Sequence, residues 1–416
     1  MIPIALAAFL MLTGCGQHTG EEADPGSTGA HADHDDHDHD EEGHADEAAT
    51  ETDGPEARLA LTYDGGVLVL RAADGEVLLD HAAEGFIRVN PAGDERHVFL
   101  STSKGWEALD LGAWTQAHGD HGHSFVGEPH LTGTVIEGQE PGHVVAHGGR
   151  TVLFDDGTGG YTVLDPHDLA EEDPELTEHA TDEAHHGVAV ALPNGNLLHT
   201  VGTSDARNGV RLVTAAGHEL AATSDCPGVH GEAFAGEVAG FGCEDGVVLV
   251  DGRTITKAQS PDAYGRIGNL AGHEESPVLL GDYKSDPDAE LERPTRIALI
   301  DTRTARVQLV DVDASYSFRS LGRGPGGEAL VLGTDGNLRV IDPESGQVTV
   351  TIPVTAEWTE PEQWQQPRPA LAVLDGTAYV TEPATRQVHV VDLAAGKVTG
   401  SHDLPQVPNE IVGVTG

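Results

Sequence analysis

A short apolar strand, a Gly-containing turn and a second apolar strand recur along this 416-residue chain, and this repeat constrains the fold most strongly. Examples are "GVAVALPNGNLLHTVG" (187–202), "EALVLGTDGNLRVIDPESGQVTVTIPV" (328–354) and "LAVLDGTAYVTEPATRQVHVVDLAAGKVTG" (371–400). Alternating Val and Leu residues favour strands, and the Asp-Gly and Ser-Gly pairs supply the positive φ angles of tight hairpin turns. A repeat of about 40 to 55 residues with this strand density is typical of a β-propeller.

We therefore expect an all-β fold, namely a β-propeller with eight blades. A propeller with seven blades is the alternative. Seven complete units begin at inner strands near Phe86, His143, His186, His230, Arg266, Phe318 and Pro369. The stretch from Leu59 to Asp80 resembles an eighth unit without its first strand, which "NEIVGVTG" (409–416) would supply. The two chain ends would then close the ring and cover an otherwise bare sheet edge. A parallel α/β fold is disfavoured because no amphipathic helix separates the strands.

The first 57 residues differ in composition from the rest of the chain. The apolar run in "MIPIALAAFLMLTGCGQ" is too short to span a membrane, and its ending resembles a bacterial lipobox. We expect residues 1–15 to be a lipoprotein signal with Cys15 as the lipidated residue. Residues 16–57 hold fifteen acidic residues, six His and no Lys or Arg, so we expect disorder there. Residues 58–416 would form the propeller, lipid-anchored outside the cytoplasm and touching the membrane through the anchor alone.

The formal net charge of −48 disfavours nucleic acid as a partner, because phosphate binding needs clustered Lys and Arg. Apart from Cys15, the chain has two cysteines, Cys226 and Cys243. Outside the cytoplasm such a pair usually forms a disulfide. Two zinc-binding thiolates are the alternative.

The densest group of His residues in the predicted propeller lies in "WTQAHGDHGHSFVGEPH" (114–130). Its short, Gly-broken spacing predicts a loop between strands. Imidazoles on such a loop can converge on one ion, and three of them with one carboxylate suit Zn²⁺. The candidate ligands are His118, His121, His123 and Asp120, with His130 nearby. A solvated loop without metal is the alternative.

A second candidate site emerges when the predicted blades are aligned. "PGHVVAHGG" (141–149), "AHHGVAVAL" (184–192) and "CPGVHGEAFAG" (226–236) each place a His at the start of an inner strand. Inner strands line the channel of a propeller, so His143, His186 and His230 should face one another at one rim, with Glu232 and His185 near enough to contribute. The alternative is that each His only satisfies a backbone carbonyl. The first group follows a third strand, which indicates the opposite rim and a separate site.

Catalytic motifs are absent from the sequence. It has no G-x-S-x-G elbow, no P-loop and no dinucleotide fingerprint between a strand and a helix. We therefore expect no enzymatic activity. The alternatives are a propeller enzyme of the lyase or quinone-dependent dehydrogenase type, and an interaction scaffold that binds no metal.

The segments "WTQAHGDHGHSF", "HHGVAVALPNGN" and "CPGVHGEAFAGEVAGFGCEDGVVLV", with the acidic His-rich N-terminal stretch, resemble the AztD proteins over residues 59–416. These are extracytoplasmic zinc metallochaperones of β-propeller fold that hand zinc to the solute-binding protein of a zinc ABC transporter. The resemblance implies a Cys226–Cys243 disulfide. It also implies zinc ligands among His118, His121, His123, His186 and His230. The lipobox is a departure, because these relatives are soluble periplasmic proteins.

The expected function is thus that of a monomeric zinc chaperone with Zn²⁺ as its cargo. The stretch "HADHDDHDHDEEGH" (31–44) is too rich in competing carboxylates to fix one coordination geometry. We expect it to capture zinc with low affinity and to raise the zinc concentration near the propeller. Its imidazoles are His31, His34, His37, His39 and His44.

Overall fold

The computed structural model describes residues 49–119, 121–171 and 173–416. Within these residues the secondary structure is β apart from one 3-10 helix, η1 (Pro166–Ala170), which confirms the predicted all-β class. The strands form eight four-stranded antiparallel sheets and one three-stranded sheet. No helix among the described residues has the length and hydropathy needed to cross a membrane.

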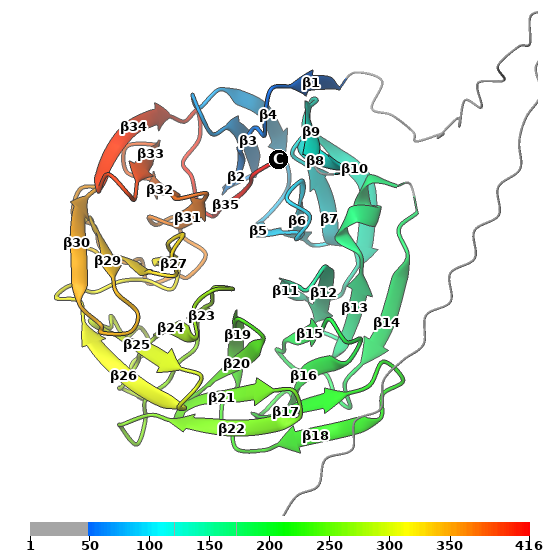
Figure 1. Ribbon diagram of the computed structural model, residues 1–416, viewed down its shortest axis with the longest axis vertical. Helices are drawn as coiled ribbons and strands as arrows, with labels where there is room; N and C mark the ends of the chain where they lie inside the picture. The colour runs from blue at the N-terminus through cyan, green and yellow to red at the C-terminus, as the bar shows by residue number, and fades with distance from the viewer. Residues whose placement is uncertain (1–48, 120, 172) are drawn as a thin grey trace, which may run out of the picture. The chain divides into compact units, whose positions relative to one another are not determined.

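The eight four-stranded sheets follow one another around a ring, and one strand of each lies nearest the centre (Figure 1). From the centre outward, the first sheets contain β35 (Ile411–Val414), β2 (Arg58–Tyr63), β3 (Gly66–Arg71) and β4 (Val77–Ala82); β5 (Arg88–Pro91), β6 (His97–Thr102), β7 (Gly105–Asp110) and β10 (His130–Glu137); β11 (Pro141–His147), β12 (Arg150–Asp155), β13 (Gly160–Leu164) and β14 (Leu176–Ala180); β15 (Ala189–Ala191), β16 (Leu197–Gly202), β17 (Arg207–Val213) and β18 (Glu219–Thr223).

The remaining four sheets have the same order from centre to rim. They contain β19 (His230–Ala235), β20 (Val238–Cys243), β21 (Gly246–Asp251) and β22 (Thr254–Gln259); β23 (Leu270–Ala271), β24 (Val278–Asp282), β25 (Arg296–Asp301) and β26 (Arg306–Asp311); β27 (Leu321–Arg323), β28 (Ala329–Leu332), β29 (Asn337–Ile341) and β30 (Val348–Pro353); β31 (Leu371–Leu374), β32 (Thr377–Glu382), β33 (Gln387–Asp392) and β34 (Lys397–Asp403).

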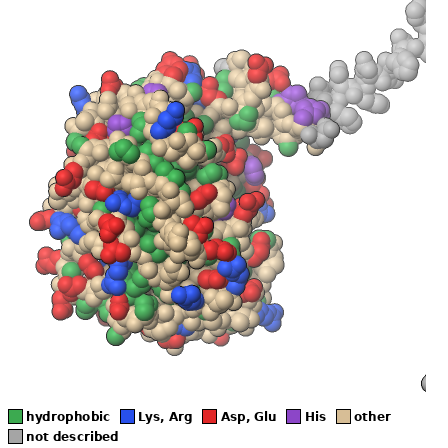
Figure 2. Space-filling model, turned by 60° about the vertical axis from the view of Figure 1, so that its left-hand side comes forward, with side chains coloured by type: hydrophobic (Ala, Val, Ile, Leu, Met, Phe, Trp, Pro, Cys, Tyr) green, Lys and Arg blue, Asp and Glu red, His purple; other side chains and the backbone are tan. Residues whose placement is uncertain are grey.

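The core lies between neighbouring sheets rather than inside one of them. Ala60 and Val69 of one sheet pack against Val89 and Val98 of the next, and all four side chains are buried. Strands β2 and β3 are therefore buried on both faces, whereas the outer strand β34 alternates between exposed and half-buried residues. Acidic and basic side chains are interspersed over the face drawn in Figure 2.

The ring is closed by the two ends of the described chain, as the sequence predicts. Strand β35 pairs antiparallel with β2, with Leu61 opposite Ile411. Just before β35, the carboxylate of Glu410 accepts hydrogen bonds from Arg88 and from Arg319. Glu410 and Arg319 are both largely buried. Glu410 thus ties the closing strand to β5 through Arg88 and to the segment before β27 through Arg319.

Cys226 and Cys243 form a disulfide with a Cα–Cα distance of 5.0 Å, which confirms the predicted pairing and rules out the thiolate alternative. Both residues are fully buried in the cluster that contains Val229 and Phe241. The disulfide fixes the segment that leads into β19, and His230 is the first residue of that strand.

Two features differ from the sequence-based expectations. The segment "HGDHGH" was expected to be a loop, but β8 (Ala113–His118) and β9 (His121–Val126) form a hairpin there, inserted between β7 and β10. β1 (Thr50–Thr52) pairs with β9, although it lies inside the stretch 16–57 that was expected to be disordered. Both differences have one physical cause, because each strand satisfies the backbone hydrogen bonds of the other. Residues 1–48, including Cys15 and the stretch 31–44, lie outside the described residues.

Candidate metal sites

Three histidines from consecutive sheets meet at one end of the central channel, and we call His143, His186 and His230 the central cluster. Their candidate ligand nitrogens all lie within 4.8 Å of one another. The ring centroids are 5.2 Å apart for His143 and His186, 5.4 Å for His143 and His230, and 5.0 Å for His186 and His230. Nitrogens bound tetrahedrally to one Zn²⁺ at about 2.1 Å are roughly 3.4 Å apart, so small side-chain movements would complete such a site.

Hydrogen bonds orient two rings of the central cluster. Nδ1 of His186 lies 2.5 Å from a carboxylate oxygen of Asp156, and Nδ1 of His230 lies 2.7 Å from the carbonyl oxygen of Gly268. When each Nδ1 donates its hydrogen to that oxygen, both Nε2 atoms carry lone pairs. These two Nε2 atoms are 3.0 Å apart. Both rings thus present the tautomer that binds a metal through Nε2.

Burial favours the neutral form of the imidazoles in this cluster. It lowers the pKa of His143 well below the usual value, and the neighbouring His230 and His186 lower it further. Burial likewise lowers the pKa of His230 to about 3. Neutral imidazole is the form that binds a metal ion, so these two ligands need not lose a proton at neutral pH.

Glu232 lies beside the central cluster, as the sequence predicts. Its carboxylate oxygen is 3.9 Å from Nδ1 of His143. Burial raises the pKa of Glu232 to about 7. A cation bound by the three imidazoles would favour the ionised carboxylate, which makes Glu232 a candidate fourth ligand.

His185 was expected to contribute to this site, and the structure assigns it a different environment. Its side chain is buried, with Nδ1 2.9 Å from the carbonyl oxygen of Glu183 and Nε2 2.9 Å from the hydroxyl of Thr200. Both ring nitrogens are occupied, so His185 supports the backbone before β15 and is not a ligand.

The central cluster opens into a cavity of about 600 Å³. The cavity is lined by polar and charged groups together with Phe318 and the half-exposed Trp364. Arg88, Arg266 and Lys284 are among the lining residues. Glu232 and Asp282 line the cavity as well, so a metal ion would reach the central cluster from solvent past side chains of both charges.

The second group, which we call the hairpin cluster, consists of His118, His121 and His123. Cα register pairs His118 with His121 across β8 and β9, and His123 follows two positions later on the same face of β9. Nε2 of His121 lies 3.2 Å from Nε2 of His123. The H-x-x-H-x-H spacing thus brings three imidazoles to one face of a hairpin, where their ligand nitrogens lie within 4.8 Å of one another.

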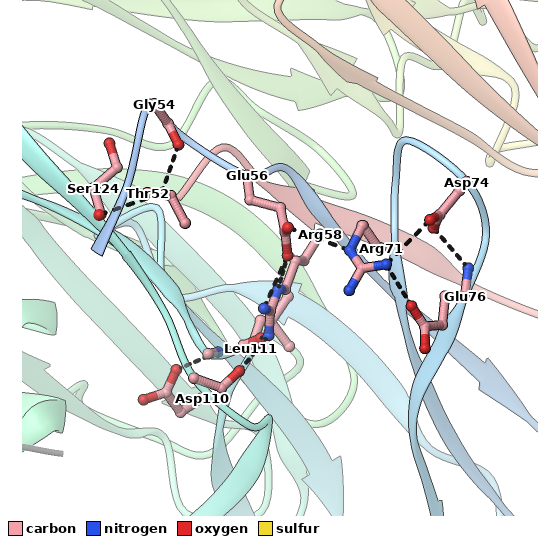
Figure 3. A network of polar contacts seen from close by, with 12 residues as sticks. Thr52, Gly54, Glu56, Arg58, Arg71, Asp74, Glu76, Asp110, Leu111 and Ser124 are labelled. Atoms are coloured by element: carbon pink, nitrogen blue, oxygen red, sulfur yellow. Dashed lines mark hydrogen bonds and ion pairs between the residues drawn. The ribbon is translucent and has the colours of Figure 1, made fainter. Parts of the chain in front are cut away.

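The hairpin cluster is more exposed and less firmly held than the central cluster. Its one described carboxylate partner is Glu51 of β1, 2.6 Å from Nδ1 of His123, and the Glu51 side chain is 59% exposed. The base of the hairpin is better fixed. Arg58 donates to the carbonyl oxygen of Leu111 at 2.6 Å and to the carboxylate of Glu56 (Figure 3). It also donates to the carbonyl oxygen of Gly127 at 2.9 Å. Thr52 of β1 donates to the carbonyl oxygen of Ser124 in β9 at 3.3 Å (Figure 3).

The two clusters lie on opposite faces of the ring. The central cluster lies where inner strands begin, and the hairpin follows the end of β7, the third strand of its sheet. In a four-stranded antiparallel sheet these two positions are at opposite ends. The carbonyl oxygen of Gly416, just past the end of the inner strand β35, accepts a hydrogen bond from Thr115 of the hairpin at 2.8 Å, which agrees with this placement.

Not every predicted ligand joins a cluster. Asp120 lies outside the described residues, as do His31, His34, His37, His39 and His44. His130 begins β10, and its Nδ1 lies 3.1 Å from the carbonyl oxygen of Glu128. It belongs to neither group of converging ligands.

Sequence reasoning missed the residues that orient the imidazoles. Asp156 follows β12, the second strand of its sheet, and such strands end on the face where inner strands begin. Aligning the ends of the second strands, in addition to the starts of the first strands, would have shown that Asp156 lies near the central cluster. Glu51 gives no comparable signal, because it is 72 residues from His123 and comes from a stretch without periodicity.

The ring of four-stranded sheets, with converging histidines at its channel, defines a β-propeller with two candidate transition-metal sites. No protein-family model matches the chain. A curated protein, the zinc chaperone AztD of Citrobacter koseri, is 27% identical over 364 residues, which make up 84% of this chain and 84% of that protein.

Solved structures give the same result. The crystal structure of Citrobacter koseri AztD matches with a TM-score of 0.76 and 25% identity, covering 87% of this chain and 99% of that one. Apo AztD from the same organism matches with a TM-score of 0.76 at 24% identity, covering 87% and 98%. The dihydro-heme d1 dehydrogenase NirN, at 12% identity and a TM-score of 0.51 over 85% and 74%, shares the fold alone. The chain is thus similar to AztD in sequence and in fold, which confirms the resemblance noted in its sequence.

Proposed function

We propose that this protein is a zinc metallochaperone outside the cytoplasm, with Zn²⁺ as its cargo and the central cluster as its tighter site. The observation that carries the proposal is the convergence of His143, His186 and His230 from three consecutive sheets within 4.8 Å. The similarity to a protein named zinc chaperone supports zinc as the metal. Imidazole ligands alone also suit copper, so zinc supply and site geometry decide which ion is carried.

The central cluster has three properties of a tight site. Asp156 and the Gly268 carbonyl orient two of its rings. Burial keeps His143 and His230 neutral. The carboxylate of Glu232 lies close enough to be a fourth ligand. The hairpin cluster is more exposed, because His118 and His121 lie at the surface and the Glu51 carboxylate beside His123 is exposed too. We therefore propose that the hairpin cluster exchanges zinc quickly and that the central cluster retains it.

Metal analysis of purified protein tests this division. The variant H143A/H186A/H230A should lose the zinc that survives gel filtration, whereas H118A/H121A/H123A should keep it. His218→Ala, at an exposed turn away from both clusters, is the matched control and should bind like wild type. If the central triple variant retained tightly bound zinc, the proposed site would be wrong.

We further propose that the protein delivers zinc to the solute-binding protein of a zinc ABC transporter. A chaperone transfers its cargo in a complex, so transfer should be faster than dissociation into solution and rebinding. Stopped-flow transfer measured with and without an excess of chelator distinguishes the two routes. If the chelator intercepted all of the zinc, the protein would be a store and not a donor.

The lipobox-like N-terminus supports a proposal about location. We propose that Cys15 is acylated and holds the protein at the outer face of the cytoplasmic membrane, as a monomer. Detergent-phase partitioning of the full chain should place wild type in the detergent phase and Cys15→Ser in the aqueous phase. Wild type found in the aqueous phase would contradict the anchor.

A further inference from the structure

Two arginines, Arg207 and Arg266, lie next to the central cluster. Arg266 lines the same cavity as the three imidazoles, and Arg207 lines an adjoining hollow of about 600 Å³ together with His186. Nη1 of Arg207 donates to the backbone carbonyl of His186 at 3.4 Å. The guanidinium of Arg266 lies over Gly268, where an added Cβ would be 3.3 Å from Nε. The carbonyl of this same Gly268 orients His230.

Neither guanidinium is paired with a carboxylate. Among the described residues, no carboxylate oxygen lies within 4.0 Å of Arg207 or Arg266. The nearby carboxylate of Asp156 already accepts from His186 and from the backbone N–H of Gly187. Two more deeply buried arginines have partners for their donors: Arg319 is paired with Glu410, and Arg323 donates to the carbonyl oxygens of Ala271, Val278 and Gly327. In a chain with 70 Asp and Glu against 22 Lys and Arg, two unpaired half-buried arginines are conspicuous.

The two positive charges also act on each other. Burial lowers the pKa of Arg207, and the neighbouring Arg266 lowers it further; the carboxylates of Asp156 and Glu244 oppose this shift, although neither lies within 4.0 Å of Arg207. Half-buried like charges held close together raise the free energy of the folded state, and an anion between them would lower it.

We propose that Arg207 and Arg266 form a subsite for a carboxylate that binds beside the metal at the central cluster. A guanidinium matches the planar geometry of a carboxylate and donates two parallel hydrogen bonds to it. A carboxylate oxygen is also an ordinary zinc ligand, so one group can contact the arginines and the metal together. The inference rests on the proposed zinc site, and it adds the chemistry that would accompany zinc into and out of that site.

The same carboxylate chemistry has two possible sources, a free dicarboxylate and an acidic side chain of a protein partner. In either case zinc and carboxylate should strengthen each other's binding by the same factor, because coupling between two sites is reciprocal. Removing the carboxylate would then leave the metal beside two positive charges, which favours its release.

The test uses succinate and a tetraglutamate peptide as probes of the full-length protein. Zinc affinity is measured by competition with a fluorescent chelator, with and without each probe, and the chelator is recalibrated in each solution. Wild type should bind zinc at least about 5-fold more tightly with an effective probe. R207Q/R266Q should bind zinc and show no such gain. Arg303→Gln, which removes an exposed arginine paired with Asp301, is the matched control and should behave like wild type.

The pattern of outcomes identifies the source. A gain with succinate alone indicates a free dicarboxylate, a gain with the peptide alone indicates a protein side chain, and a gain with both indicates carboxylate recognition without size selection. Absence of a gain with either probe, in wild type that binds zinc, overturns the subsite. Calorimetric titration of succinate and peptide into metal-free protein tests the carboxylate subsite separately from the zinc site. Binding of a probe to wild type that is lost in R207Q/R266Q supports the subsite even if the protein binds no zinc. R207K/R266K, which keeps both charges, replaces the Gln variant if that variant is unfolded by circular dichroism.

Discussion

The Nε2 atoms of His186 and His230 lie 3.0 Å apart, although 44 residues separate the two histidines in the chain. Each ring is held from its other side, His186 by Asp156 and His230 by the carbonyl of Gly268. Two lone pairs aimed at one point repel each other unless a proton or a metal ion lies between them. The arrangement is therefore stabilised by occupation of the site.

Asp156→Asn should weaken zinc binding without removing a ligand. The amide can no longer accept as a carboxylate does, so the tautomer and the basicity of His186 are less well fixed. We expect a loss of about 10- to 100-fold in zinc affinity, measured by chelator competition. Asp251→Asn, at an exposed position at the end of β21, is the control. Unchanged affinity in Asp156→Asn would show that His186 needs no orienting partner.

The pH dependence of stability should include a contribution from His199, which belongs to neither cluster. Burial lowers its pKa, although the hydrogen bond from Nδ1 to the carbonyl of Thr200 opposes this shift. The unfolded chain then binds a proton that the folded chain rejects, so stability falls as the pH drops below about 6.5. In metal-free protein, His199→Gln should lose less stability than wild type between pH 7.5 and pH 5, measured by urea denaturation. An equal loss in both proteins would assign the acid sensitivity to other groups.

Glu410→Gln should destabilise the ring more than loss of a surface ion pair does. The substitution leaves Arg319, which is 7% exposed, without its carboxylate partner. Breaking a buried pair from one side typically costs about 3 to 5 kcal/mol. Arg303→Gln removes a solvent-screened surface pair and should change the free energy of unfolding far less than Glu410→Gln does. Equal effects in chemical denaturation would mean that water replaces Glu410 around Arg319.

Removing the disulfide should affect stability and the central cluster together. C226A/C243A opens a loop with a sequence separation of 17 residues, which corresponds to a loss of about 3 kcal/mol in the chain-entropy account. His230 begins its strand four residues after Cys226, so its position should become less well defined. Thermal unfolding measures the first effect and zinc competition the second. A stable variant with weakened zinc binding would show that the disulfide serves the site more than the fold.

Deleting residues 31–44 should slow zinc loading and leave zinc at the central cluster. The deletion spares β1, which is paired with β9 of the hairpin. The rate of zinc uptake at limiting zinc is the measurement, with a His-free replacement of equal length and charge as the control. Complete loss of bound zinc would mean that the tight site requires these residues.

Much of the fold follows from the sequence because a propeller repeats one local pattern. The same periodicity placed His143, His186 and His230 at equivalent positions, so their convergence could be predicted although no short motif joins them. The hairpin could not be predicted as strands, because Gly and Asp in "HGDHGH" are turn formers. Its strands are stabilised by distant residues, namely pairing with β1, stacking of Trp114 on Phe125 and the Arg96 cation over Trp114.

Residues that act through hydrogen bonds were harder to predict than residues that act as ligands. Asp155 and Asp156 are adjacent, yet Asp155 accepts backbone N–H groups of Gln139 and Glu140, and only Asp156 holds an imidazole. Two neighbouring carboxylates on a strand end point in different directions. Their roles depend on which sheet lies beside each of them.

Closure of the ring by β35 has a consequence for how the molecule tolerates damage. The inner edge of β2 is covered by β35 and by the backbone of Asn409 and Glu410 just before it, and the carbonyl of Gly416 accepts a hydrogen bond from Thr115 of the hairpin. Loss of these few residues would bare the N–H and C=O groups of β2, an edge on which a second copy could add a strand. Cleavage of the chain near the C-terminus would therefore favour self-association through the exposed edge of β2.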